Sequence, residues 1–122
     1  MTAPANGLSP AEAERLAMLA EECGEVIQAV TKILRHGYES FHPNDLFKGH
    51  PKPGAKSNRE RLEDELDDLR AVLALCEEEA DIDLSLDCEI LAAIDRKLTY
   101  AHHQDGARAR AELDHSAEEG AI

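Results

Sequence analysis

Four acidic residues form two matched pairs, and each pair is set in a stretch whose apolar residues recur at helical spacing. Glu22 and Glu25 make the first pair, and Glu65 and Asp68 make the second. Residues three apart on a helix lie about 5–6 Å from each other, so the acids of one pair can share a cation. Carboxylate oxygens are the ligands that hard divalent cations prefer. The spacing therefore predicts two helical pairs that together bind Mg²⁺, with Mn²⁺ as a substitute.

The surrounding pattern turns both pairs towards the protein interior. Glu22 and Glu65 each have an apolar residue three positions before and four positions after. Half-buried carboxylates are costly unless something neutralises them, and residues 60 to 81 hold ten acids but only two arginines. Acidic runs on helices are often plain solvated faces. The repetition of the pair on two helices favours a metal site instead.

Three helices are expected to position these residues. Ser9 to Glu12 has a capping-box pattern that starts a helix running to about residue 36, where Gly37 supplies the stop. A second capping box at residues 57 to 60 starts a helix that runs to about residue 80. A third helix follows the turn at residues 81 to 83 and reaches about residue 103. We expect one domain over residues 1–104 and a polar tail or short helix over 105–122.

A long loop is expected over residues 38–57, because this stretch has three prolines, two glycines and no helical period. Its aromatic and basic residues favour a substrate lid, in a loop whose length suggests a function. Tyr38, Phe41 and Phe47 lie in this loop, where they could stack on a nucleobase or simply pin the loop to the helices.

The composition favours an all-α protein, since Ala, Leu and Glu dominate and aromatic residues make up only 3%. The net charge of −13 argues against binding to duplex nucleic acid or to anionic membranes. Cys23, Cys76 and Cys88 lie in apolar helical patterns without zinc-ligand spacing, so we expect reduced core residues. A basic, apolar leader and a long apolar run are both missing, which predicts a cytoplasmic protein.

The two acidic motifs resemble the signature of the MazG-like all-α nucleoside-triphosphate pyrophosphohydrolases. Glu21-Glu22-Cys23-Gly24-Glu25 is similar to the E-E-x-x-E motif of that family, and Glu65-Leu66-Asp67-Asp68 to its E-x-x-D motif. The resemblance covers roughly residues 10 to 100. It implies that Glu22, Glu25, Glu65 and Asp68 bind Mg²⁺. It also implies hydrolysis of nucleoside triphosphates between the α- and β-phosphates to a nucleoside monophosphate and pyrophosphate.

Other residues take roles from this resemblance or from their position. Glu21 is a solvent-facing residue or a group that orients water at the site. Asp95-Arg96-Lys97 resembles the segment that carries a phosphate-binding base in the family, and Lys97 is the better match. Lys32 is a candidate phosphate contact near the end of the first helix. Arg35 and His36, beside it, are better explained by favourable interaction with the helix dipole.

The resemblance also implies a helical bundle completed by homo-oligomerisation, as a homodimer or homotetramer. Two alternatives stay open at this point. One is phosphoribosyl-ATP pyrophosphohydrolase, a relative with similar metal motifs. The other is a non-catalytic helical module that binds metal or a partner protein.

Overall fold

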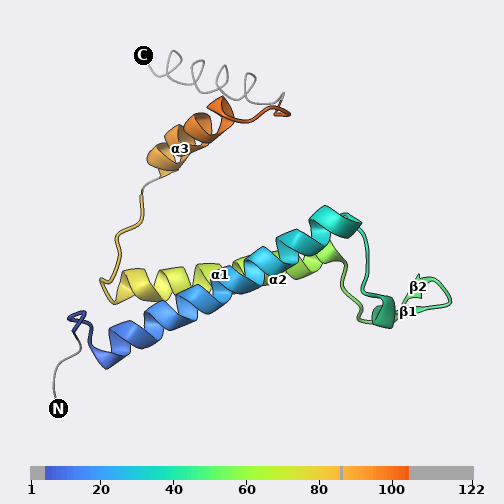
Figure 1. The fold of residues 1–122 in the computed structure, drawn as a ribbon, viewed down its shortest axis with the longest axis horizontal. Coiled ribbons are helices and arrows are strands. Elements are labelled where there is room, and N and C mark those ends of the chain that lie inside the picture. Colours follow the sequence, from blue (N-terminus) through green and yellow to red (C-terminus); the bar gives the residue numbers. More distant parts are fainter. Residues whose placement is uncertain (1–4, 86, 105–122) are drawn as a thin grey trace. The chain divides into compact units, whose positions relative to one another are not determined.

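The computed structural model describes residues 5–85 and 87–104 and is mostly helical there, which confirms the all-α class (Figure 1). The elements in chain order are α1 (Pro10–His36), η1 (Pro43–Asp45), β1 (Leu46–Phe47), β2 (His50–Pro51), α2 (Asn58–Glu78) and α3 (Asp87–Thr99). The chain divides into two compact units, one ending at Asp83 and the other beginning at Leu84. The first unit holds α1, α2 and the hairpin, and the second holds α3.

Both long helices begin with the capping boxes that the sequence predicts. The Ser9 hydroxyl accepts a hydrogen bond from the Glu12 amide at 3.1 Å, and the Glu12 carboxylate accepts one from the Ser9 amide at 2.9 Å. Ser57 and Glu60 repeat the arrangement at the start of α2. These reciprocal bonds satisfy amides that have no partner inside the helix. The first helix therefore begins and ends where the sequence predicts.

α1 and α2 pack side by side in antiparallel directions (Figure 1). Most of their buried and half-buried positions recur at alternating steps of three and four residues, which is the spacing of coiled-coil packing. We call these positions the α1–α2 seam: Arg15, Leu19, Glu22, Val26, Ala29 and Ile33 on α1, and Asn58, Leu62, Glu65, Leu69, Val72 and Cys76 on α2. Glu22 and Glu65 therefore occupy positions that are normally apolar.

Polar contacts fasten the two ends of this helix pair. At one end the Arg15 guanidinium donates two hydrogen bonds to the Asp81 carboxylate, at 2.5 and 3.0 Å. At the other end the Asn58 side-chain amide donates to the Gly37 carbonyl at 3.2 Å. The Asn58 main-chain amide donates to the Ser40 carbonyl at 2.8 Å. These contacts hold the two ends of the helix pair together.

The prediction of an irregular loop over residues 38–57 is wrong in part, because this segment contains η1 and an antiparallel β1–β2 hairpin. Lys48 and Gly49 connect the strands with φ angles of 51° and 79°. Two consecutive residues with positive φ make the tight turn whose twist matches a hairpin. Strands of two residues are too short to show an alternating pattern, so the sequence offered no strand signal.

Two further expectations need correction. Cys76 is buried, but Cys23 and Cys88 are exposed rather than core residues, and Cys23 lies off the α1–α2 seam. The third helix ends at Thr99, before the expected residue 103. The predicted tail over 105–122 lies outside the described residues. In the described ranges, no helix combines the length and apolar character needed to cross a membrane.

Candidate metal centre

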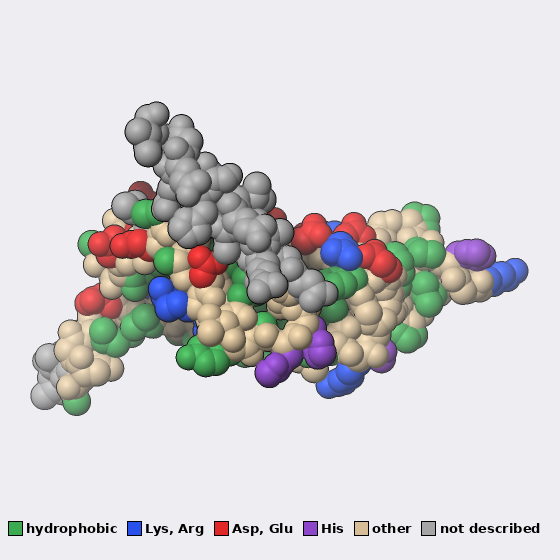
Figure 2. All heavy atoms as spheres, turned by 90° about the horizontal axis from the view of Figure 1, so that it is seen from above, with side chains coloured by type: hydrophobic (Ala, Val, Ile, Leu, Met, Phe, Trp, Pro, Cys, Tyr) green, Lys and Arg blue, Asp and Glu red, His purple; other side chains and the backbone are tan. Residues whose placement is uncertain are grey.

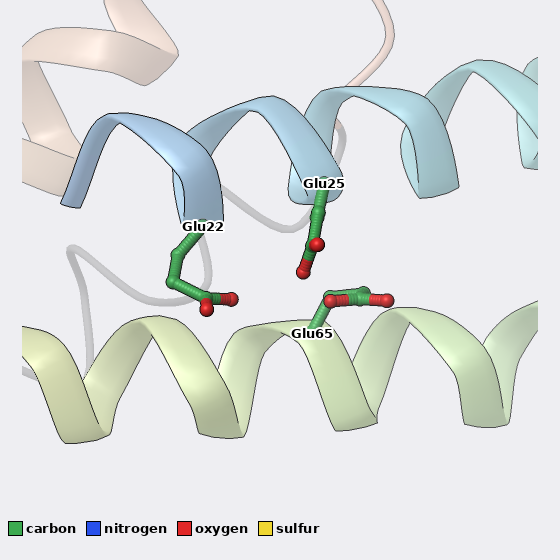
Figure 3. A group of neighbouring side chains, drawn as sticks. All are labelled: Glu22, Glu25 and Glu65. Carbon is green, nitrogen blue, oxygen red and sulfur yellow. The ribbon is translucent and has the colours of Figure 1, made fainter. Parts of the chain in front are cut away.

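Three of the four predicted ligands come together between α1 and α2. Glu22 and Glu25 extend from α1 towards α2, and Glu65 extends from α2 towards them (Figure 3). Each of the three offers a carboxylate oxygen, and these oxygens lie within 4.8 Å of one another. All three side chains are half-buried. Two helices thus bring together acids that lie 40 or more positions apart in the chain.

These three carboxylates differ from the other half-buried charges of the described chain. Seven charged residues in residues 5–85 and 87–104 are half-buried, and four of them have a neutralising base or a cap. These four are Glu12, which caps α1, the Arg15–Asp81 pair, and Asp45, which accepts from Arg61 at 2.6 Å. The remaining three are Glu22, Glu25 and Glu65, for which no basic partner occurs among the described residues. Among the described residues, half-buried charge is therefore compensated everywhere except at this cluster.

Two oxygens of the cluster are also without a hydrogen bond. Oε2 of Glu22 and Oε2 of Glu65 are buried and have no hydrogen-bond partner among the described residues. Buried acceptors almost always have a partner, because losing water without replacement is unfavourable. An oxygen donor set with unsatisfied buried lone pairs fits a divalent cation such as Mg²⁺. Glu22, Glu25 and Glu65 are the residues that would hold it.

The electrostatics of the cluster agree with this shortage of positive charge. Burial raises the pKa of the Glu22 carboxyl group, and the charges of Glu25 and Asp68 raise it further. The pKa of Glu65 is raised first by its side-chain hydrogen bonding with Glu25, which requires a proton shared between two acids, and then by burial. Without a cation, the site therefore retains protons more strongly than ordinary glutamates do.

Asp68 and Glu21 lie at the edge of the cluster. Asp68 is exposed, so the expected second inward-facing pair is wrong in that respect, although its charge raises the pKa of both Glu22 and Glu65. A step of three residues from Glu65 carries Asp68 off the seam, which continues at Leu69. Glu21 is exposed as well. Their roles as a fourth ligand and as a water-orienting group stay predictions.

A cavity of about 390 Å³ adjoins the cluster, and Glu25 and Glu65 form part of its wall. Four basic residues also line it: Lys32, Lys52, Lys56 and Arg61. Three of these are engaged, because Lys52 donates to the Asn44 carbonyl, Lys56 pairs with Asp64 and Arg61 pairs with Asp45. The Lys32 ammonium has no partner within the described part of the chain. This residue was predicted as a phosphate contact, and the structure places it beside the acidic cluster.

The other predicted substrate contacts lie elsewhere. The Tyr38 ring stacks against Arg59, whose guanidinium carbon lies 4.2 Å from the ring centre, and it does not line this cavity. That contact favours the pinning explanation for Tyr38. Arg96 and Lys97 lie on α3 in the second unit, where both are exposed. Their contact with phosphate stays a prediction.

Residues 52 to 61 contribute cavity residues that the sequence reasoning did not single out, including Lys52, Asn58 and Arg61. A signal was present, because basic residues are frequent here in a chain with twice as many acids as bases. Figure 2 shows Lys, Arg and His side chains, in blue and purple, at the end of the helix pair that carries the hairpin. How close these basic side chains lie to the acidic pairs depends on how α2 packs back along α1.

Comparison with protein-family models, with curated proteins and with solved structures finds no match to this chain. Membership of the MazG-like family therefore stays a prediction from two short motifs. The function has to be argued from the site itself.

Proposed function

We propose that this protein is a Mg²⁺-dependent nucleoside-triphosphate pyrophosphohydrolase that cleaves between the α- and β-phosphates. One observation carries the proposal. Glu22, Glu25 and Glu65 are half-buried without a basic partner among the described residues, and they adjoin a cavity that also presents lysine and arginine side chains. An acidic cluster that needs a divalent cation, next to bases that suit an anion, fits a substrate bound as its magnesium complex.

Each residue type has a distinct task in this proposal. The three glutamates hold Mg²⁺, and Asp68 supplies a further ligand or negative charge at the exposed edge. The chemistry that Mg²⁺ supplies when bound is charge neutralisation on phosphate oxygens and activation of water. Lys32 contacts the phosphate chain with its free ammonium group.

The proposed reaction uses water as the nucleophile. This choice is supported by the acidic cluster, because the Mg²⁺ that the three glutamates would hold activates water and makes a protein nucleophile unnecessary. Water adds to the α-phosphorus, the bond to the bridging oxygen breaks, and that oxygen leaves with pyrophosphate. The proton of water is released to solvent.

We also propose that the protein works as a homo-oligomer. A second stripe with seven-residue periodicity runs along α1, outside the α1–α2 seam, and all its members are exposed: Leu16, Ala20, Cys23, Ile27, Val30 and Leu34. On this face the exposed fraction is 65% for Ile27 and 82% for Leu34. A second copy of α1 is the partner that this spacing suits best.

A pyrophosphate-release assay tests the proposed activity. The panel contains the eight common ribo- and deoxyribonucleoside triphosphates and phosphoribosyl-ATP, each with Mg²⁺ and with EDTA. We expect a nucleoside monophosphate and pyrophosphate in Mg²⁺ and no turnover in EDTA. Cleavage of phosphoribosyl-ATP alone would identify the first alternative. Metal binding without any turnover would support the non-catalytic module and overturn the enzyme proposal.

A further inference from the structure

A second cavity, of about 330 Å³, lies where the end of α1 meets the start of α2. Its lining includes three Lys or Arg residues and two histidines, and no Asp or Glu belongs to the described lining. The three cations are Lys32, Arg35 and Arg61. This composition contrasts with the whole chain, in which 26 acidic residues outnumber 13 basic ones. We call this space the basic cavity.

The basic residues reach this cavity from three different segments. Arg35 and His36 belong to the last turn of α1, His42 belongs to the segment before η1, and Arg61 belongs to the first turn of α2. Favourable contact with the helix dipole explains basic residues at the end of α1 alone. It does not explain why His42 and Arg61 face the same space. The convergence of three segments indicates a built binding surface for an anion.

Side chains, rather than the start of α2, must bind that anion. The Asn58 amide donates to the Ser40 carbonyl and the Arg59 amide donates to the Tyr38 carbonyl, each at 2.8 Å. The Glu60 amide donates to the Ser57 hydroxyl at 3.2 Å. The first amides of α2 are therefore already satisfied. His42 accepts from the Asn44 amide through Nδ1 at 3.1 Å, which leaves Nε2 as the nitrogen that carries a proton.

The basic cavity is connected to the candidate metal centre by shared residues. Lys32, Asn58 and Arg61 line both this cavity and the cavity beside Glu25 and Glu65. The side chains of Lys32 and Arg61 thus lie between a place for a cation and a place for an anion. A phosphate chain that starts at the carboxylates can extend past Lys32, whose ammonium has no partner among the described residues, and past Arg61, which also donates to Asp45.

We propose that the basic cavity binds the β- and γ-phosphates of the substrate and holds pyrophosphate after cleavage. This inference rests on the proposed function and assigns the direction in which the triphosphate lies. The α-phosphate is at the carboxylate cluster, and the leaving group points towards Arg35 and His42. Phe41 also lines this cavity and offers a stacking surface for a base. The phosphate end is favoured because the described lining holds Lys32 and Arg35, no acid, and Arg61, whose charge is shared with Asp45.

Binding of inorganic pyrophosphate to the full-length protein tests this proposal without requiring turnover. Titration calorimetry in EDTA measures binding by the side-chain cations alone, because no divalent metal is present. Arg35→Gln removes one cation of the basic cavity and should raise the Kd for pyrophosphate about tenfold, since a charge-assisted hydrogen bond is lost. Arg70→Gln is the matched control, because Arg70 is an exposed helical arginine that lines neither cavity.

The outcomes separate this proposal from the proposed function. A selective effect of Arg35→Gln on pyrophosphate binding supports the basic cavity, even if no nucleotide is hydrolysed. Equal weakening by both variants would show only the effect of net charge and would overturn the proposal. The proposal would also be overturned if the unaltered protein does not bind pyrophosphate, or if Arg35→Gln does not weaken that binding. The pyrophosphohydrolase activity could still be present in those last cases, as the release assay would show.

Discussion

The carboxyl group of Glu65 combines three properties that no ordinary surface glutamate has. It occupies a seam position between two helices, one of its oxygens is buried without a hydrogen bond, and its pKa is raised by Glu25 and by burial. A raised pKa means that the ionised form is unfavourable in the folded protein. The residue therefore destabilises the metal-free fold near neutral pH, which is the pattern of a functional residue rather than a structural one.

Glu65→Gln should separate activity from stability. The substitution keeps the volume but removes the charge, so turnover in Mg²⁺ should fall on the order of a hundredfold or more. The melting temperature in EDTA should hold or rise, because repulsion among the remaining acids is smaller. Glu63→Gln, at an exposed position of the same helix, is the control and should leave turnover unchanged. A less stable Glu65→Gln protein with full activity would contradict the metal assignment.

The pH dependence of stability provides a second test at the residue scale. Glu22 and Glu65 have pKa values above the ordinary 4.5, so the folded protein binds more protons than the unfolded chain in this range. The free energy of unfolding in EDTA should therefore decrease as pH rises above 4.5 through the raised values. Thermal melts at a series of pH values would measure this slope. It should become shallower in Glu65→Gln, and an unchanged slope would argue against a raised pKa at this residue.

Asp81 affects the pH dependence of stability in the opposite sense. Its effect can be distinguished from that of Glu22 and Glu65. Hydrogen bonding from Arg15 holds the pKa of Asp81 below its ordinary 3.8. The resulting stabilisation is present above that value and is lost as pH falls through the lowered one. The two effects occupy different pH ranges, so the decrease above 4.5 can be assigned to the glutamates.

At the scale of the elements, the end of α2 carries local strain. Ala80 has a φ of 61°, in the left-handed region that glycine adopts without steric cost. The Asp81 amide donates to the Cys76 carbonyl at 2.9 Å, and the Ala80 amide donates to the Glu77 carbonyl at 3.0 Å. These bonds form the helix-ending motif that usually contains glycine at this position. α2 therefore stops at Glu78 without the residue type that best suits its termination.

Ala80→Gly should stabilise the protein by about 0.5–1 kcal/mol, because relief of the left-handed strain exceeds the extra flexibility of glycine in the unfolded chain. Chemical denaturation would measure the change. Ala74→Gly, inside α2 and exposed, is the control and should instead destabilise the helix. Loss of stability in both variants would show that the α2 terminus does not adopt this geometry in solution.

At the scale of the whole molecule, a chain with net charge −13 concentrates negative charge at one buried place. Any salt would screen the general repulsion, whereas only a divalent cation fits three oxygens that lie within 4.8 Å of one another. Millimolar Mg²⁺ should therefore raise the melting temperature above that in NaCl of matched ionic strength. Equal melting temperatures in the two salts would contradict a specific site.

Self-association should depend on the outer stripe of α1. Ile27→Asp places a charge in the middle of that stripe, so it should convert the homodimer or homotetramer into monomers in sedimentation velocity experiments. Ala74→Asp adds the same charge at an exposed position of α2 and should leave the assembly intact. An unaltered protein that is already monomeric would contradict the proposed homo-oligomer.

The sequence alone determined the features that depend on neighbours along the chain. Both capping boxes, the span of α1 and the half-buried positions of Glu22 and Glu65 follow from residue type and helical periodicity, which act over one or two turns. The short hairpin could not be predicted from the sequence, because each of its strands has only two residues. Cys23 was misplaced because α1 carries two apolar stripes, and periodicity does not say which stripe meets α2.

Only the tertiary structure decided which distant residues meet. The antiparallel alignment of α1 and α2 brings Glu65 to Glu22 and Glu25, and it places Asp68 at the exposed edge. The same alignment joins the end of α1 to the start of α2, where Lys32 and Arg61 line two cavities. Helix register is set by packing along the whole seam, so no local pattern contains it. The candidate chemistry could be inferred from residue types, but its geometry required the fold.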